Sequence, residues 1–189
     1  QILPKPTKER IQELMAAADL VVATGSAGLV KAAYSSGTPA YGVGAGNAVT
    51  VVDETADLAD AARKIALSKT FDNATSCSSE NSIVVQEALR DRLVAALQAQ
   101  GGHLCTPAEK AALKAVMWPD GATLNPKIVA RPASVIADLA GIAGADAIRF
   151  LLVAGEQPLE DDLFAREKLS PVSTLWTDAA FAEAVETVE

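Results

Sequence analysis

The 189-residue chain is poor in aromatic residues and in side chains that bind metals. Aromatic residues make up 4% of the chain, which also has one histidine and two cysteines. A structural zinc site normally takes four ligands from cysteine and histidine, more than this chain can supply. Two cysteines also do not make a disulfide framework, and they favour a reducing, cytoplasmic compartment.

Positive charge and long apolar runs are scarce as well. The net charge is −8 at pH 7, and lysines and arginines occur in runs of two at most. Nucleic acid and anionic membranes are therefore not expected partners. No apolar stretch approaches the roughly 20 residues of a membrane span, and no signal-peptide pattern is present.

What the chain does have is a large apolar fraction, 50% of its residues, much of it Ala and Val. Short β-branched runs alternate with helical patterns, which is typical of an α/β fold with a mostly parallel sheet. The predicted strands are residues 19–24, 40–43, 48–52, 82–85, 127–130, 147–154 and 172–176. The predicted helices are residues 8–18, 29–36, 53–69, 86–100, 106–117, 134–143 and 178–188. Thr7 and Thr106 are predicted N-caps, and Pro107 is predicted at the first helical position. Residues 156–171 are predicted to be a polar loop.

Both ends of the chain suggest that it comes from a longer protein. The first residue is Gln1 rather than Met, and the last residues continue a helical pattern. We therefore expect this sequence to be an interior segment.

Two glycine-containing turns are candidate binding sites. "ATGSAG" (residues 23–28) joins a predicted strand to a helix, where backbone N–H groups can bind phosphate, although an ordinary strand-to-helix connection has the same pattern. "GVGAGN" (residues 42–47) has three glycines, including Gly44, so its backbone can approach another group closely. A turn that links two domains would also explain it.

A third candidate is Cys77, within "KTFDNATSCSSENSIVV" (residues 69–85). It could be a nucleophile, a small core residue or half of a disulfide. Its small polar neighbours, before an apolar strand, favour an accessible thiol over a packed one. Cys105 is assigned to packing at a strand end, and a hydrolase pair of Cys77 with His103 is a minor alternative.

Together, these motifs resemble the CoA-acylating branch of the aldehyde dehydrogenase superfamily. "ATGSAGLVKAAYSSGTPAYGVGAGN" is similar to the end of the branch's cofactor domain, "SKTFDNATSCSSENSIVV" to its catalytic-cysteine segment, and "FAREKLSPV" to a later cofactor-binding segment. The resemblance implies an aldehyde dehydrogenase-like fold. Residues 1–47 would end a Rossmann-type nucleotide-binding domain, and residues 48–189 would form a catalytic domain that lacks its C-terminal part.

The resemblance also assigns roles to individual residues. Cys77 matches the nucleophile, and Glu167 matches the glutamate that binds the ribose hydroxyls of the cofactor. Leu169 stands where the family usually has a phenylalanine. The cofactor-binding residues implied are Thr24, Gly25, Ser26, Gly44, Glu167 and Leu169, with NAD or NADP as cofactor.

One departure from the wider family refines the expected reaction. Hydrolytic members have a water-activating glutamate 34 residues before the cysteine, and counting back from Cys77 reaches Val43. Valine cannot accept a proton, so the resemblance implies that coenzyme A, not water, takes the acyl group from a Cys77 thioester. An aldehyde would be converted to an acyl-CoA, or the reverse, and the full-length protein would be a homo-oligomer.

The hydroxyl-bearing residues around Cys77 suggest a polar or charged aldehyde, with sulfoacetaldehyde preferred over acetaldehyde. Two other functions stay open. One is a related acyl-phosphate reductase, which shares the cysteine chemistry but not coenzyme A. The other is a non-catalytic, truncated member that serves as an assembly module.

Overall fold

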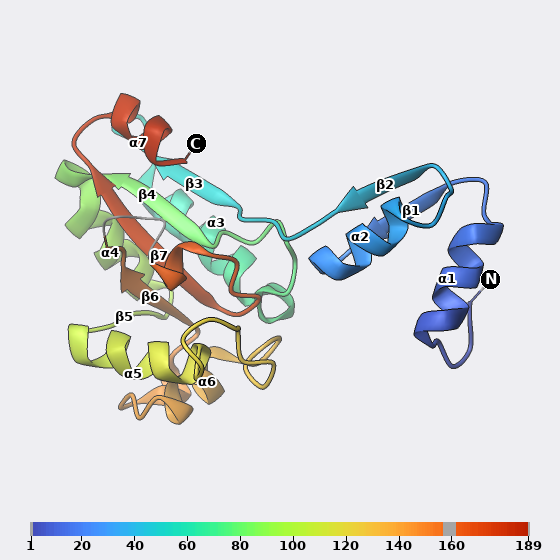
Figure 1. Ribbon diagram of the computed structural model, residues 1–189. Coiled ribbons are helices and arrows are strands. Elements are labelled where there is room, and N and C mark those ends of the chain that lie inside the picture. Colours follow the sequence, from blue (N-terminus) through green and yellow to red (C-terminus); the bar gives the residue numbers. More distant parts are fainter. Residues whose placement is uncertain (1, 157–161, 189) are drawn as a thin grey trace. The chain divides into compact units, whose positions relative to one another are not determined.

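The computed structural model describes residues 2–156 and 162–188 (Figure 1). The chain divides into two compact units, residues 1–46 (unit 1) and residues 47–189 (unit 2). Strands and helices alternate in both units, as the sequence predicts, so the α/β class is confirmed.

Unit 1 is a small parallel pair of strands with two helices. Its elements are α1 (Lys8–Ala17), β1 (Val21–Thr24), α2 (Ala27–Tyr34) and β2 (Ala40–Val43). The strands pair in parallel, with Val21 beside Ala40. Thr7 is the N-cap of α1, as predicted, because its hydroxyl accepts a hydrogen bond from the Arg10 N–H at 3.3 Å.

The centre of unit 2 is a parallel sheet of five strands. Its strands are β3 (Val49–Val52), β4 (Ser82–Gln86), β5 (Gly102–Leu104), β6 (Phe150–Ala154) and β7 (Val172–Asp178). Their spatial order is β3-β4-β7-β6-β5, so the strand that comes last in the chain lies in the middle of the sheet. The segments before β4 and β7 therefore lie next to each other at the amino ends of the strands.

Helices cover both faces of this sheet (Figure 1). Helices α3 (Leu58–Thr70) and α4 (Arg90–Ala99) pack on the face that presents Ile83, Val85, Phe150 and Leu152. Alternate residues point to the other face, which is covered by α5 (Pro107–Met117), α6 (Ala133–Leu139) and α7 (Phe181–Val188).

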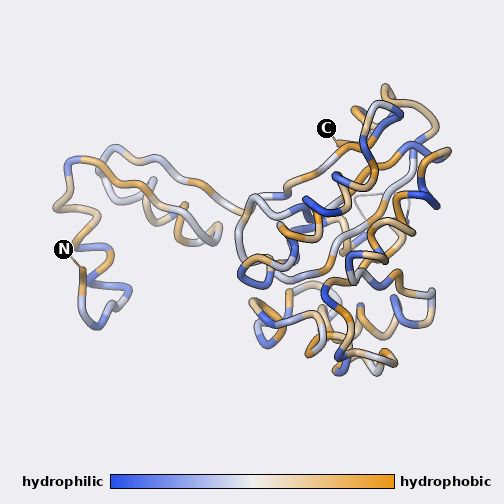
Figure 2. The backbone as a smooth tube through the Cα atoms, turned by 180° about the vertical axis from the view of Figure 1, so that it is seen from behind, coloured by the Kyte–Doolittle hydropathy of each residue, from blue (hydrophilic) through white to orange (hydrophobic). Residues whose placement is uncertain are grey.

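Hydrophilic and hydrophobic residues alternate along the helices (Figure 2), as expected of helices with one buried side. Among residues 2–156 and 162–188, no helix combines the length and the apolar character needed to cross a bilayer.

Short-range signals set the helix starts. Thr106 and Glu109 form a capping box at α5, and Pro107 occupies the first helical position, as predicted. Helix α3 begins later than predicted, at Leu58 rather than residue 53. The reason is that Asp57 caps it, accepting hydrogen bonds from the N–H groups of the second and third residues of the helix.

Two predictions about local structure are wrong. Residues 127–130 form turns, not a strand. Asn125 accepts hydrogen bonds from Lys127 and Ile128, and Ala130 has a left-handed backbone with φ of 59°.

The prediction of a polar loop at residues 156–171 is also wrong for part of the residues that the structure describes. Residues 157–161 lie outside the described residues, but Asp162 to Ala165 are buried and include a short 3-10 helix, η5 (Leu163–Ala165). Phe164 belongs to the core under α5 and α6. The apolar residues 163–165 are therefore buried, although the sequence just before them is acidic.

Candidate active site

Cys77 lies in an irregular loop between α3 and β4, here called the cysteine loop (residues 71–81). The loop starts with the 3-10 segment η1 (Phe71–Ala74), in which Asp72, Asn73 and Ala74 have φ of 47°, 50° and 58°. Non-glycine residues rarely adopt this left-handed conformation, and three in a row need support from neighbouring groups. Asn73 provides some of it, because its side-chain amide donates to the Ala130 carbonyl at 3.0 Å.

The thiol itself is presented on a tight turn. The Ser79 N–H donates to the Ser76 carbonyl at 3.0 Å, which makes Cys77 the second residue of a β-turn. The hydroxyls of Ser76 and Ser78, on either side of it, lie 2.9 Å apart. Cys77 is a free, exposed cysteine, so the core and disulfide alternatives are wrong.

Cys105 differs from Cys77 in its accessibility. It is buried at the carboxyl end of β5, which confirms its packing role. Burial, with a further contribution from the Glu109 carboxylate, raises the pKa of the Cys105 thiol to about 12. The thiol therefore stays protonated and unreactive at neutral pH.

His103 does not pair with Cys77. Its strand, β5, lies three positions from β4 in the sheet, and its ring nitrogen Nε2 lies 3.2 Å from a Glu109 carboxylate oxygen. The hydrolase alternative is therefore wrong. The donor atoms of His103, Cys105 and Glu109 lie within 4.8 Å of one another, but the same Glu109 oxygen accepts the Thr106 N–H at 2.7 Å. These contacts describe a capped helix start, not a prepared metal site.

Glu167 and Leu169 lie in a second loop, here called the glutamate loop (residues 166–171), which leads into β7. Both are partly exposed, whereas Lys168 between them has no exposed surface. Leu169 has a left-handed backbone with φ of 45°. The loop therefore turns the two predicted cofactor contacts toward the surface by burying the lysine.

Hydrogen bonds join the two loops. The Lys168 N–H donates to the Asn81 side-chain oxygen at 3.0 Å. The Ala130 N–H donates to the Leu169 carbonyl at 3.1 Å, and the Ala130 carbonyl accepts from Asn73. The structure thus brings the Cys77 and Glu167 loops together. Our reading of the sequence missed Asn81, Ala130 and Lys168, because nothing local marks these long-range partners.

Two lysines are buried near this junction. Lys69, at the end of α3, is 1% exposed, and burial lowers the pKa of its amine to about 8, with the Glu80 carboxylate partly opposing the shift. Burial also lowers the pKa of Lys168 well below its usual range, and Lys69 lowers it further.

The Lys69 amine gives a testable dependence of stability on pH. The unfolded chain keeps this proton up to the ordinary pKa of 10.5, whereas the folded chain loses it at about 8. Between these values the unfolded state binds more protons, so the free energy of unfolding should rise, by about 1 kcal/mol from pH 8 to 9. Lys168 acts in the same direction. Urea unfolding at both pH values checks this, and a Lys69→Met variant should show a smaller rise. A stability that falls over this interval would contradict the assignment.

Above pH 9 the trend should weaken. The ordinary pKa of the Cys105 thiol is 9.0, and in the folded chain it is about 12. Here the folded state keeps a proton that the unfolded state has lost, so this group makes stability fall as pH rises. The measurement is therefore clearest between pH 8 and 9.

The remaining predicted site residues belong to unit 1. Thr24, Gly25 and Ser26 are exposed between β1 and α2, and the Ser26 hydroxyl accepts the Leu29 N–H at 3.4 Å. Gly25 has φ of 152° and donates its N–H to the Val43 carbonyl, so its conformation explains the glycine.

In the "GVGAGN" turn, the backbone at Gly42 closely approaches side chains of helix α2 rather than leaving room for a ligand. A side-chain carbon at Gly42 would lie 2.6 Å from Val30 and 2.8 Å from Tyr34 of α2. Gly44 is exposed, and a side-chain carbon there would meet none of the described residues within 4 Å. Room for a ligand thus exists at Gly44, not at Gly42.

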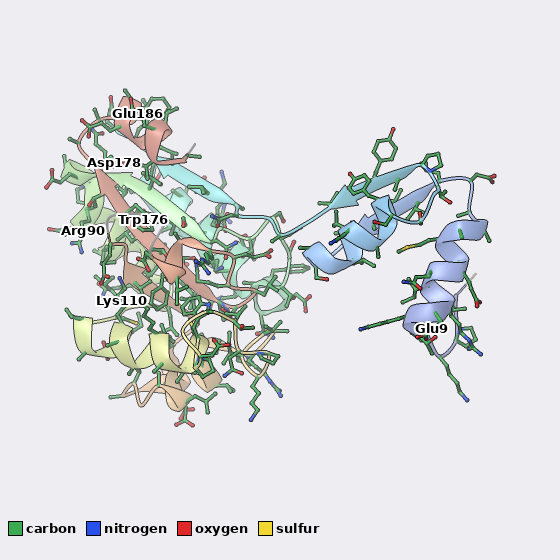
Figure 3. The ribbon with its side chains drawn as sticks, viewed as in Figure 1. Glu9, Arg90, Lys110, Trp176, Asp178 and Glu186 are labelled. Atoms are coloured by element: carbon green, nitrogen blue, oxygen red, sulfur yellow. The ribbon has the colours of Figure 1, made fainter. Side chains whose placement is uncertain are left out.

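A cavity of about 580 Å³ lies elsewhere, at the carboxyl ends of β5 and β6. Its lining includes Arg90, Lys110, Lys114 and Glu156, but none of the predicted site residues. Lys110 is a residue of α5 (labelled in Figure 3), and its amine donates to the Ala154 carbonyl of β6 at 2.6 Å and pairs with Glu156 at 2.9 Å. Its charge is already compensated. Cys77 and Glu167 instead lie in the loops that precede β4 and β7, at the amino ends of the strands, opposite to this cavity.

Comparison with known proteins identifies the family. Residues 1–112 match the sequence pattern of the "Aldehyde dehydrogenase family", and this match includes the cysteine loop. The chain belongs to the aldehyde dehydrogenase family.

Two relatives within the family are acylating enzymes by name. The chain is 52% identical over 191 residues to a sulfoacetaldehyde dehydrogenase (acylating) from Cupriavidus necator, covering 100% of this chain and 38% of the relative. It is 49% identical over 188 residues to an enzyme of the same name from Bilophila wadsworthia, covering 97% of this chain and 40% of the relative.

A solved aldehyde dehydrogenase confirms the predicted fold. The acetylating aldehyde dehydrogenase from Geobacillus thermoglucosidasius superposes with a TM-score of 0.90 at 39% identity, covering 96% of this chain and 40% of that one. The chain thus spans about two fifths of the length of the proteins it matches. The division into nucleotide-binding and catalytic domains, and the roles of the individual site residues, stay predictions.

Proposed function

We propose that this chain carries the catalytic cysteine of a cytoplasmic CoA-acylating aldehyde dehydrogenase, which converts an aldehyde to an acyl-CoA or the reverse. The observation that carries the proposal is the exposed Cys77 thiol on the cysteine loop, which Asn81 joins by a hydrogen bond to the glutamate loop, at the amino ends of the strands of an aldehyde dehydrogenase-like sheet. The names of the relatives, which include "acylating", point to the same reaction. The complete protein would act on small molecules and form a homo-oligomer.

The chemistry follows from the thiol. The Cys77 sulfur, as thiolate, attacks the aldehyde carbon, and the oxygen becomes an oxyanion that the Cys77 backbone N–H can stabilise. Loss of hydride from the same carbon leaves a thioester on Cys77. The thiolate of coenzyme A then attacks this thioester, which forms the acyl-CoA and frees the Cys77 sulfur. Val43 in the usual place of the water-activating glutamate favours this thiol over water.

The residues assigned to the cofactor fit a dinucleotide. When bound, NAD or NADP supplies the acceptor for the hydride. The exposed first turn of α2 offers N–H groups, and Thr24 and Ser26 offer hydroxyls, of the kind that bind phosphate. The Gly25 N–H is already bonded to the Val43 carbonyl, so Gly25 would contribute through its conformation. Glu167 offers a partly exposed carboxylate for ribose hydroxyls, and Gly44 leaves room for a ligand beside the backbone.

A groove next to the neighbours of Cys77 supports a charged aldehyde as substrate. The groove has a volume of about 400 Å³, and it is lined by Lys64, Leu67, Ser68, Phe71, Ser76 and Ser78. The Lys64 amine pairs with Asp60 at 2.6 Å, but this pair is exposed and therefore weak, so a sulfonate can compete for the ammonium group, and the serine hydroxyls can donate to it. With two relatives named for sulfoacetaldehyde, we propose sulfoacetaldehyde as the substrate and acetaldehyde as a poorer one.

The proposal can be tested in the complete protein with each aldehyde, NAD or NADP, and either coenzyme A or inorganic phosphate. We expect a thioester with coenzyme A, and a kcat/KM for sulfoacetaldehyde at least about tenfold above that for acetaldehyde. An acyl phosphate as the product would favour the reductase alternative. Absence of any aldehyde turnover would favour the assembly module.

Lys64→Met should lower kcat/KM for sulfoacetaldehyde about tenfold and leave that for acetaldehyde nearly unchanged, because only the first substrate carries the charge. Arg63→Met is a matched control. Arg63 also pairs with Asp60, at 2.7 Å, but it does not line the groove. Equal effects of both variants on both substrates would contradict a sulfonate site at Lys64.

A further inference from the structure

Lys168 has the contacts of a buried cross-link rather than those of a charge partner. Its side chain has no exposed surface, and its amine donates to the Phe164 carbonyl at 2.7 Å and the Arg166 carbonyl at 3.0 Å. Both acceptors belong to the backbone that leads into the glutamate loop. The amine therefore holds this backbone folded around itself.

The surroundings of Lys168 agree with that role. Burial lowers the pKa of the amine, the nearby Lys69 lowers it further, and Asp162 only partly opposes them. The two backbone carbonyls give this buried amine hydrogen-bond partners, which offsets the cost of removing it from water.

Asn81 connects this folded segment to the cysteine loop. Its side-chain oxygen accepts the Lys168 N–H, its own N–H donates to the Ala48 carbonyl at 2.8 Å, and its carbonyl accepts the Thr174 N–H at 2.9 Å. Asn81 is 4% exposed and stands four residues after Cys77. One side chain therefore fixes the end of the cysteine loop relative to the middle of the glutamate loop.

A second connection reaches the other end of the cysteine loop. Asn73 donates to the Ala130 carbonyl, and the Ala130 N–H donates to the Leu169 carbonyl. The two loops are therefore joined at two places, on either side of Cys77. Glu167 and Leu169 flank the joined residue Lys168, and neither can shift without straining these bonds.

We propose that Asn81 and Lys168 are positioning residues that fix the cofactor contacts Glu167 and Leu169 relative to the Cys77 thiol. This inference rests on the proposed function, because it takes Glu167 as a cofactor contact. Neither Asn81 nor Lys168 needs to touch the cofactor or the aldehyde. Their effect is on how well the cofactor site is formed before the cofactor binds.

Asn81 offers an informative pair of variants. Asn81→Ala removes the acceptor and leaves the buried Lys168 N–H unpaired, whereas Asn81→Asp has the same shape and keeps an oxygen at that position. In the complete protein, we expect Asn81→Ala to raise the dissociation constant of NADH at least about tenfold, and Asn81→Asp to raise it less than about threefold. The rate of Cys77 alkylation by iodoacetamide should change less than about twofold in both.

A purely structural role would give a different result. Equal weakening of NADH binding by both variants, or no weakening by either, would overturn the inference. If Asn81→Ala does not fold, Lys168→Met replaces it: the loss of both amine donors should also raise the NADH dissociation constant at least about tenfold, and unchanged binding would overturn the inference.

The unsubstituted protein separates this inference from the proposed function. If it binds NADH but forms no acyl-CoA, the proposed function fails, while the comparison of Asn81 variants still decides the positioning role. If it does not bind NADH, Glu167 is not a cofactor contact and the inference fails with it.

Discussion

Replacing Cys77 by alanine in the complete protein should reduce acyl-CoA formation by at least about 10³-fold, because the substitution removes the sulfur that carries the acyl intermediate. Cys77 is exposed on its turn, and the second cysteine is buried. Burial raises the pKa of the Cys105 thiol to about 12, so Cys105 cannot take over the reaction. The measurement is the steady-state rate of thioester formation with saturating aldehyde, cofactor and coenzyme A.

Cys105→Ala is the matched control for this prediction. It removes the same kind of atom from the same unit, and we expect activity to change less than about threefold. Mass spectrometry after iodoacetamide treatment gives an independent check: the folded chain should gain one alkyl group, at Cys77, and the urea-unfolded chain two. Loss of activity in Cys105→Ala but not in Cys77→Ala would show that the nucleophile has been assigned to the wrong cysteine.

Replacing Phe164 by alanine should lower the free energy of unfolding of unit 2 by about 3–5 kcal/mol. Phe164 has no exposed surface, and its ring meets that of Trp118 edge-on, with 4.9 Å between the ring centres. The substitution removes this contact and leaves a cavity under α5 and α6, in a segment whose backbone also supports Lys168. Both tryptophans of the chain are in unit 2, so their fluorescence during urea unfolding reports on this unit.

Phe181→Ala provides the comparison. Phe181 is in the same unit, at the start of α7, and is 53% exposed, so its loss should cost less than about 1 kcal/mol. Similar destabilisation by the two substitutions would mean that Phe164 does not occupy the core as described.

The sequence predicts those parts of the structure that depend on neighbouring residues. The alternation of strands and helices, the caps at Thr7 and Thr106 and the accessible thiol at Cys77 all have local causes, and each is confirmed. The strand predicted at residues 127–130 is a turn, because the left-handed Ala130 depends on Asn73 and Leu169, which are remote in the sequence. The Asn81–Lys168 bond spans 87 residues and leaves no local pattern at all.

The site residues also differ in how far local sequence marks them. Polar neighbours made Cys77 a candidate nucleophile, but Glu167 stood out only through the resemblance to a family, since nearby acidic residues look alike in sequence. The burial of Phe164 among those acids was unexpected for the same reason: its partners, including Trp118, come from elsewhere in the chain.

The central position of β7 has a consequence for the synthesis of the protein. When the ribosome has completed the strands up to β6, β4 and β6 each lack the neighbour that finally separates them. Their open edges can pair wrongly with other chains until β7 is released and inserts between them. The nascent protein should therefore be most prone to aggregation during the interval before residue 178 leaves the exit tunnel, and most dependent on chaperones at that stage.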